Sequence, residues 1–170
     1  GGVAALDLLA TWGSLGGERV VVLGAGNLAL EVARQSRAAG HTVVTIADIA
    51  EQPSGDPALV AELEASGVEF VPGVTIRYAQ GTEGLEQVML VPVDAEGRRT
   101  PGTPYPVRAD TLVVAIGRAP AVELAYLAGC ELDIDVQHGG YVVRHTPTME
   151  TTQPGVFVAG DVAGANDAAF

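Results

Sequence analysis

Residues 19–29 read Arg-Val-Val-Val-Leu-Gly-Ala-Gly-Asn-Leu-Ala, an apolar run followed at once by a glycine-rich turn. The β-branched run from Arg19 to Leu23 predicts a strand that is buried on both faces of a sheet. Residues 28–39 are rich in Ala, Leu, Glu and Arg and are closed by Gly40, so they predict a helix. Residues 41–46 predict a second strand. Strand, turn, helix and strand in this order form a βαβ unit, the parallel element of an open α/β sheet.

The turn Gly24-Ala25-Gly26-Asn27-Leu28-Ala29 has the G-x-G-x-x-[GA] spacing of loops that hold a pyrophosphate. The first glycine permits the tight turn, the second lets the backbone approach the ligand, and the small third residue lets the helix pack close to the strand. A phosphate would meet the free N–H groups at the start of the helix. An ordinary strand-to-helix turn is the alternative, but the flanking strands and helix favour nucleotide binding.

Two acidic side chains are candidate ligands near this turn. Glu31 lies one turn into the helix, where it faces either the same cleft or solvent near the positive end of the helix dipole. Asp48 ends the second strand, where a carboxylate can accept hydrogen bonds from an adenosine ribose. Ala47 occupies the position one residue earlier, where that acid is expected, so a solvated strand-end aspartate is the alternative.

The rest of the chain continues the α/β pattern and then departs from it. From residue 74 to residue 107 apolar residues tend to recur at every second position, and turn-forming residues interrupt the pattern. We therefore predict a three-stranded antiparallel excursion over these residues. The other predicted elements are helices over residues 3–10, 58–66 and 122–127, parallel strands over 68–71 and 111–116, a hairpin around Gly139-Gly140 and a final strand over 156–159.

Composition narrows the possible partners. The 170 residues include nine Lys+Arg, all of them arginine, and 21 Asp+Glu, for a formal net charge of −12 at pH 7. This balance argues against a nucleic-acid partner. No apolar run approaches the roughly 20 residues of a membrane helix, so we expect no membrane partner.

The single cysteine, Cys130, cannot form an internal disulfide or a Cys-x-x-Cys pair, and no signal peptide opens the chain. We therefore expect a cytoplasmic protein, in which any redox chemistry would need an organic cofactor. Asp133 and Asp135 alternate along an extended stretch and predict a solvated face, so we expect no metal site. The three histidines predict neither a catalytic base nor a ligand, and we assign no catalytic residue.

Three segments carry a family resemblance. They are residues 20–31, residues 111–120 (Thr-Leu-Val-Val-Ala-Ile-Gly-Arg-Ala-Pro) and residues 151–161 (Thr-Thr-Gln-Pro-Gly-Val-Phe-Val-Ala-Gly-Asp). In this order they resemble the pyridine nucleotide-disulfide oxidoreductase superfamily of flavoproteins that bind two dinucleotides. Within it, the glycine turn with Ala109-Asp110 and Ile116-Gly117 is similar to glutamate synthase small subunits. Residues 123–131, 139–141 and 149–152 are similar to sarcosine and opine oxidase alpha subunits.

The resemblance implies a role for each segment. The glycine turn would bind NAD(P)H, Ala115-Ile116-Gly117 would join the nicotinamide domain to the flavin domain, and Gly160-Asp161 would contact FAD. Without the resemblance, Asp161 would be taken as a turn aspartate that caps the next segment, and Gly117 as a plain turn glycine.

We therefore expect an α/β fold with a Rossmann-like open parallel sheet, an antiparallel three-stranded excursion and a partial FAD-domain segment. Residues 1–118 would form the NAD(P)H-binding domain and residues 119–170 the start of the second FAD-binding segment. The start without methionine and the lack of a second glycine motif suggest a piece of a longer protein, inactive alone.

The expected function is the nicotinamide-binding part of an FAD-dependent oxidoreductase that moves hydride between NAD(P)(H) and flavin. The alternative is a non-catalytic nucleotide-binding or assembly module of a larger redox complex. Expected partners are the coenzyme, the remainder of the FAD domain and a partner subunit. NAD is the expected coenzyme and NADP a less favoured one, because no lysine or arginine occurs between Arg37 and Arg77, whereas Asp48 and Glu51 lie where the ribose should be.

Overall fold

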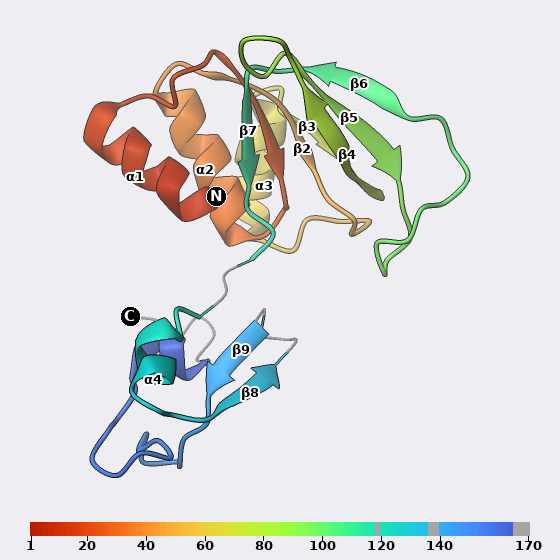
Figure 1. Ribbon diagram of the computed structural model, residues 1–170. Coiled ribbons are helices and arrows are strands. Elements are labelled where there is room, and N and C mark those ends of the chain that lie inside the picture. Colours follow the sequence, from red (N-terminus) through yellow and green to blue (C-terminus); the bar gives the residue numbers. More distant parts are fainter. Residues whose placement is uncertain (118–119, 136–139, 165–170) are drawn as a thin grey trace. The chain divides into compact units, whose positions relative to one another are not determined.

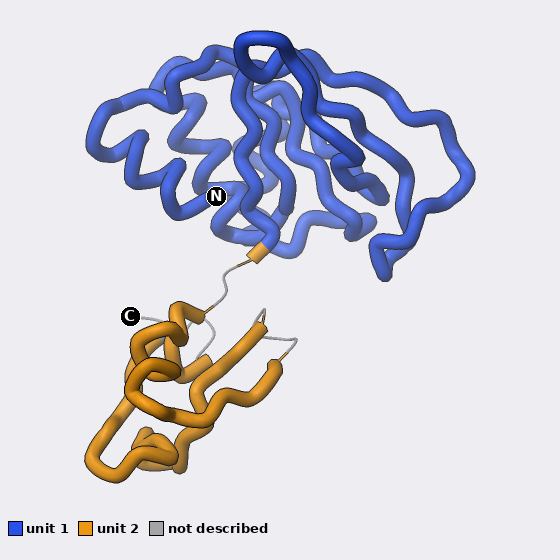
Figure 2. Tube along the Cα trace, viewed as in Figure 1, with its two compact units in different colours: residues 1–116 blue, residues 117–170 orange. Residues whose placement is uncertain are grey.

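The computed structural model describes residues 1–117, 120–135 and 140–164, except the side chain of Asp161. The chain divides into two compact units, unit 1 from Gly1 to Ile116 and unit 2 from Gly117 to Phe170 (Figure 2). This division falls two residues before the boundary expected from the sequence.

A four-stranded parallel sheet forms the centre of unit 1 (Figure 1). The strand order is β3-β2-β1-β7, so β2 lies beside β1 on one side and β7, which comes last in the chain, lies beside β1 on the other. This arrangement is the predicted open α/β sheet. Its strands are β1 Arg19–Leu23, β2 Thr42–Ala47, β3 Glu69–Val71 and β7 Thr111–Val114.

The two faces of this sheet are covered by different layers, which explains why β1 is apolar at every central position. Val20 and Val22 face a helical layer, and Val21 faces the other way, yet all three are 0% exposed. The strand is therefore buried on both faces, as its sequence predicted. The helices that supply side chains to the first layer are α1 Gly2–Trp12, α2 Asn27–Ala38 and α3 Pro57–Ala65.

The opposite face packs against a three-stranded antiparallel sheet, which confirms the predicted excursion. Its order is β4-β5-β6, and Val88 and Leu90 of β5 point toward the parallel sheet. The strands are β4 Val74–Gln80, β5 Gln87–Pro92 and β6 Tyr105–Arg108.

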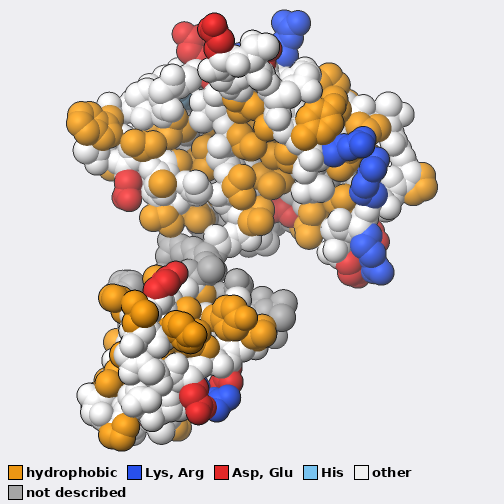
Figure 3. Space-filling model, in the orientation of Figure 1, with side chains coloured by type: hydrophobic (Ala, Val, Ile, Leu, Met, Phe, Trp, Pro, Cys, Tyr) orange, Lys and Arg blue, Asp and Glu red, His pale blue; other side chains and the backbone are white. Residues whose placement is uncertain are grey.

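Cations of unit 1 gather around this antiparallel sheet. Figure 3 shows arginine side chains beside apolar ones over the flank formed by β4, β5 and β6. Arg34 and Arg37 lie instead on α2. The arginines in or beside the antiparallel sheet are Arg19, Arg77, Arg98, Arg99 and Arg108.

Unit 2 has a small core of its own. Cys130, Val143 and Val158 form a buried cluster, against which the end of the 3-10 helix η1 packs through Val162 and Ala163. The predicted short helix and hairpin are both present, although Gly139 lies outside the described residues. The elements are α4 Glu123–Leu127, β8 Leu132–Asp135, β9 Gly140–Val143 and η1 Gly160–Ala163.

The prediction of a strand over residues 156–159 is wrong. Among the described residues this segment makes one isolated antiparallel bridge, between Glu150 and Phe157, and it belongs to none of the sheets. Two hydrogen bonds form this bridge: Thr151 N–H donates to the Val156 carbonyl, and Val158 N–H donates to the Met149 carbonyl. Val158 is buried in the unit 2 core while Phe157 is 61% exposed. Alternation of burial, rather than pairing in a sheet, therefore produces the apolar pattern.

None of the described helices combines the length and apolar character that a bilayer span requires.

Candidate functional site

The carboxyl ends of β1, β2 and β7 meet at one edge of the parallel sheet, and the glycine turn begins there. Gly24 N–H donates to Ala47 at 2.8 Å, and Ala115 N–H donates to Leu23 at 2.7 Å. Gly24 has φ +112°, and a Cβ on it would lie 2.4 Å from the Ala115 carbonyl oxygen. Glycine is therefore required here both by the backbone conformation and by the close approach of β7.

Asp48 reaches the same turn from the end of β2. Its Oδ2 accepts a hydrogen bond from Ala25 N–H at 2.6 Å, and its Oδ1 accepts one from Ala50 N–H at 2.9 Å. The carboxylate is half-buried and bonded to the first x position of the G-x-G sequence, so it is not a freely solvated strand-end group. Strand β2 thus brings an acid onto a turn that lies 23 residues earlier in the chain.

The start of α2 leaves backbone donors available. The helix begins after Gly26, which provides no side-chain cap, and the first N–H groups of a helix have no intrahelical acceptor. Ala29 and Leu30 are 0% exposed beneath this turn, which agrees with the predicted need for a small residue at position 29. Leu28 packs beside the same core.

A loop that the sequence analysis left without a role crosses this turn. We call residues 52–56 the strap loop. Ser54 N–H and Gly55 N–H both donate to the Ala25 carbonyl at 3.1 Å, and Asp56 N–H donates to Asn27 Oδ1 at 2.7 Å. Asp56 also caps α3. The side chain of Asn27 therefore links the N-termini of α2 and α3.

A hollow of about 260 Å³ opens beside Asp48. Phe70 forms part of its apolar wall, and three carboxylates, those of Asp48, Glu51 and Glu64, belong to its lining, whereas no arginine does. The sequence pointed to Asp48 and Glu51 here but not to Glu64 or Phe70, because α3 and β3 bring those residues in from separate segments. The lining residues are Ala25, Ile46, Asp48, Ala50, Glu51, Gln52, Pro53, Glu64, Phe70, Val71 and Pro72.

Glu31 makes its bonds along its own helix. Arg34 donates to its carboxylate twice, at 2.9 Å and 2.6 Å, and Gln35 Nε2 donates at 2.6 Å. The hydrogen bond from Arg34 lowers the pKa of Glu31 below its usual value. The structure therefore shows an ion pair on the α2 surface, and a ligand role for Glu31 stays a prediction.

The remaining predicted site residues lie where the units divide and in unit 2. Ala115 is buried at the end of β7, Ile116 is 72% exposed, and Gly117 has φ +148°, a conformation that favours glycine. Gly160 has φ +76° and begins η1. The side chain of Asp161 lies outside the described part of the chain, so its predicted contact with FAD stays a prediction.

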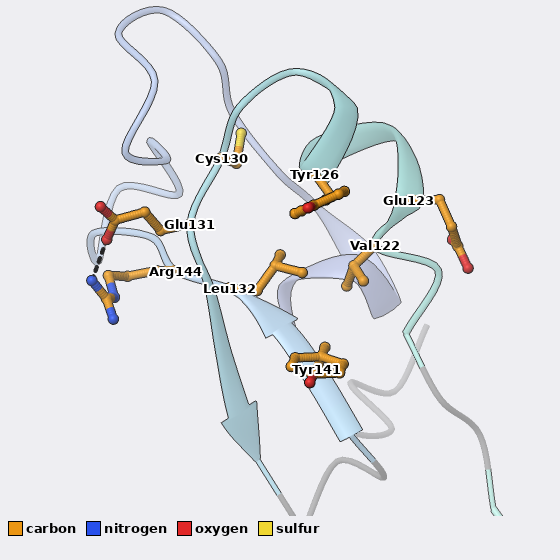
Figure 4. Close-up of a pocket in the computed structure, with 8 residues that line it drawn as sticks. All are labelled: Val122, Glu123, Tyr126, Cys130, Glu131, Leu132, Tyr141 and Arg144. Carbon is orange, nitrogen blue, oxygen red and sulfur yellow. Dashed lines mark hydrogen bonds and ion pairs between the residues drawn. The ribbon is translucent and has the colours of Figure 1, made fainter.

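Unit 2 has a hollow of about 750 Å³ between α4 and the β8–β9 hairpin (Figure 4). Tyr126 and Tyr141 lie on opposite sides of it, with Leu132 between them. At one end, Arg144 forms an ion pair with Glu131, and it also bonds Asp133 at 2.6 Å. The sequence analysis assigned no site here, because the two tyrosines become neighbours only when the hairpin folds.

An open parallel sheet with a glycine-rich turn at the carboxyl end of β1, and an acid at the end of β2, has the architecture of a dinucleotide-binding α/β domain. The sequence comparison agrees with this architecture. The chain belongs to the pyridine nucleotide-disulphide oxidoreductase family, whose profile matches residues 4–169. This is a family of FAD- and NAD(P)-dependent oxidoreductases, and the resemblance expected from the three sequence segments is confirmed.

Individual relatives show the same relationship. The chain is 33% identical over 158 residues to the putative glutamate synthase [NADPH] small chain of Cereibacter sphaeroides, covering 86% of this chain and 38% of the relative. It is 36% identical over 161 residues to the ferredoxin–NAD(+) reductase component of the biphenyl dioxygenase system of Paraburkholderia xenovorans, covering 86% of this chain and 33% of the relative. It thus spans between one third and two fifths of these relatives' length.

A solved structure supports the fold. The crystal structure of T. acidophilum thioredoxin reductase matches with a TM-score of 0.72 at 22% sequence identity, covering 89% of this chain and 46% of that chain. At this level of identity the match concerns the fold alone, and it confirms the predicted fold class.

Proposed function

We propose that unit 1 binds NAD(H), and that the chain is the nicotinamide-binding part of an FAD-dependent oxidoreductase that transfers hydride between NAD(P)(H) and flavin. The observation that carries this proposal is the carboxylate of Asp48, which the fold holds against the Gly24-Ala25-Gly26 turn at the carboxyl edge of the sheet. Ligands of open α/β sheets bind at this edge, and the two groups that face each other here suit a diphosphate and a ribose.

The residues present fit such a coenzyme. Gly26 leaves its outer side open, since the nearest atom to a Cβ built on it is 3.6 Å away. Backbone N–H groups from Gly26 to Leu28 would hold the diphosphate, helped by the positive end of α2. Asp48 would accept from ribose hydroxyls, and the hollow that contains Phe70 would take the adenine ring.

The charge of this hollow favours NAD(H) over NADP(H). A 2′-phosphate carries close to two negative charges, and it would enter a hollow lined by Asp48, Glu51 and Glu64. A like-charge contact at about 4 Å costs roughly 1 to 4 kcal/mol, depending on how well solvent screens it. Because the 2′-phosphate carries close to two charges, even the lower figure becomes about 2 kcal/mol. Since about 1.4 kcal/mol corresponds to a factor of ten, we expect at least tenfold tighter binding of NAD(H).

In unit 2, we propose that Gly160 and Asp161 contact FAD and that Ala115-Ile116-Gly117 joins the two domains. When bound, the nicotinamide and the flavin supply the hydride chemistry themselves. The chain contributes binding and orientation, and we assign it no acid, base or nucleophile. We further propose a cytoplasmic protein whose partners are the remainder of the FAD domain and a partner subunit, because the related glutamate synthase small chain is by its name one subunit of a larger enzyme.

Calorimetric titration of the chain with NADH and NADPH at low salt tests the proposal. NADH should bind at least tenfold more tightly than NADPH, and Asp48→Asn should weaken the binding of NADH. The double variant E51Q/E64Q should reduce the difference in affinity between NADH and NADPH. Glu96→Gln, which alters an exposed acid in the loop between β5 and β6, is the matched control and should change neither affinity. Failure to bind either coenzyme would refute the nucleotide-binding role. Equal or tighter binding of NADPH would refute the selectivity alone.

The flavin part has a separate test. The protein translated from the complete reading frame should purify yellow, and NADH should bleach its flavin absorbance. A colourless protein that binds NADH would favour the non-catalytic nucleotide-binding module instead.

A further inference from the structure

The side of Gly26 that lacks a Cβ points at a specific side chain. A Cβ built on Gly26 would have one close neighbour, Ser54 Oγ at 3.6 Å. The second glycine of a G-x-G-x-x-G turn lacks a side chain because the diphosphate of the coenzyme passes over it. The hydroxyl of Ser54 therefore lies beside the path that a diphosphate would take.

Three hydrogen bonds hold the strap loop in this position. Ser54 N–H and Gly55 N–H donate to the Ala25 carbonyl, and Asp56 N–H donates to Asn27 Oδ1. Gly55 also has no room for a side chain, since its Cβ would lie 2.4 Å from Leu30 Cδ1 and 3.0 Å from Asn27 N. The backbone of residue 54 is thus fixed to the glycine turn on one side and to α2 on the other.

The hydroxyl itself is available for a ligand. Ser54 is exposed, and its Oγ makes no hydrogen bond with any other described residue, whereas the hydroxyls of Ser14 and Ser66 do. A hydroxyl donates well to an anionic oxygen, and hydrogen bonds to charged groups are stronger than neutral ones.

We propose that Ser54 Oγ–H donates a hydrogen bond to a diphosphate oxygen of the bound dinucleotide, opposite the backbone N–H groups at the start of α2. The inference rests on the proposed nucleotide-binding function and adds a side-chain ligand from the loop between β2 and α3. The diphosphate then lies between the glycine turn and the strap loop, and Asn27 joins these two walls.

Titration of the full chain with three probes tests this assignment: NADH and ADP, which carry a diphosphate, and adenosine, which carries no phosphate. Ser54→Ala should weaken the binding of NADH and of ADP by about 3- to 10-fold, the loss expected for one hydrogen bond. The same variant should leave the affinity for adenosine, measured by ligand-observed NMR, unchanged. Ser54→Thr keeps the hydroxyl and should restore most of the affinity. Ser14→Ala, an exposed serine that precedes β1, is the matched control and should bind all three probes like the wild type.

The outcomes separate this inference from the proposed function. Wild-type affinity of S54A for NADH and ADP would overturn the role of Ser54, while a large loss in Gly26→Val would leave the nucleotide-binding function standing. An equal loss for adenosine would also overturn the inference, because the hydroxyl would then act on the nucleoside or on the loop. Failure of the wild-type chain to bind any probe would refute the proposed function and this inference with it.

Discussion

Gly24→Ala should destabilise unit 1 more than the same substitution at any other described glycine with a positive φ. The new Cβ would lie 2.4 Å from the carbonyl oxygen and 2.7 Å from the carbonyl carbon of Ala115, both backbone atoms of a neighbouring strand end. The positive φ of +112° costs about 1–3 kcal/mol for an alanine. Forcing β1 and β7 apart adds about 1–3 kcal/mol, the usual cost of overpacking. The total is about 2–6 kcal/mol.

Gly40→Ala is the matched control for this measurement. Gly40 has φ +92°, but a Cβ there meets no atom within 4 Å, so this variant has the conformational cost alone. Urea denaturation followed by far-ultraviolet circular dichroism gives both free energies of unfolding. The difference between the variants then measures the contact between Gly24 and Ala115. If Gly24→Ala is no more destabilising than Gly40→Ala, the glycine turn does not press on the end of β7, and our account of the site is wrong.

Three further predictions concern charge, cofactor and local stability. The pKa of Glu31 is lowered mainly by its hydrogen bond from Arg34, so the stability that this pair contributes is present above the usual pKa of 4.5. That stability is lost as pH falls through the lower folded-state pKa. Glu31→Gln should therefore flatten the acid side of a plot of unfolding free energy against pH, by no more than the few tenths of a kcal/mol that an exposed helix pair contributes. The 170-residue chain should purify without flavin, because one contact turn at Gly160 lacks a partner for the FAD diphosphate; stoichiometric flavin absorbance would contradict this. Hydrogen exchange should show residues 156–159 opening at lower free energy than residues 20–23, and equal protection would count against it.

The glycine turn shows how unevenly the ligand groups of this site are distributed along the chain. Gly26 and the start of α2 belong to one short segment, and in our proposal they would provide backbone donors. Asp48 and Ser54 come from the end of β2 and from the strap loop, and in our proposals they would provide side-chain ligands. Because the proposed diphosphate and ribose contacts need both kinds of group, parallel pairing of β1 with β2 would complete the proposed site.

Local sequence was sufficient for β1, the glycine turn, α2 and the antiparallel excursion, because each is specified by periodicity or by a residue type that only one backbone conformation accommodates. The same local signals predicted a strand over residues 156–159 and were wrong there. An alternating apolar pattern indicates burial, and in this segment Val158 is buried in the unit 2 core without belonging to a sheet.

Only the tertiary structure decided which side chains meet at the carboxyl edge. The sequence placed Asp48 at the end of a strand but left open whether its carboxylate faces solvent, and it offered no signal for Ser54. Their positions depend on hydrogen bonds to Ala25 across 23 or more residues, and on the contact of Gly24 with Ala115 across the sheet. Contacts of this kind arise from strand order and register, which are properties of the packed sheet. No single segment of the sequence carries a periodic pattern that specifies them.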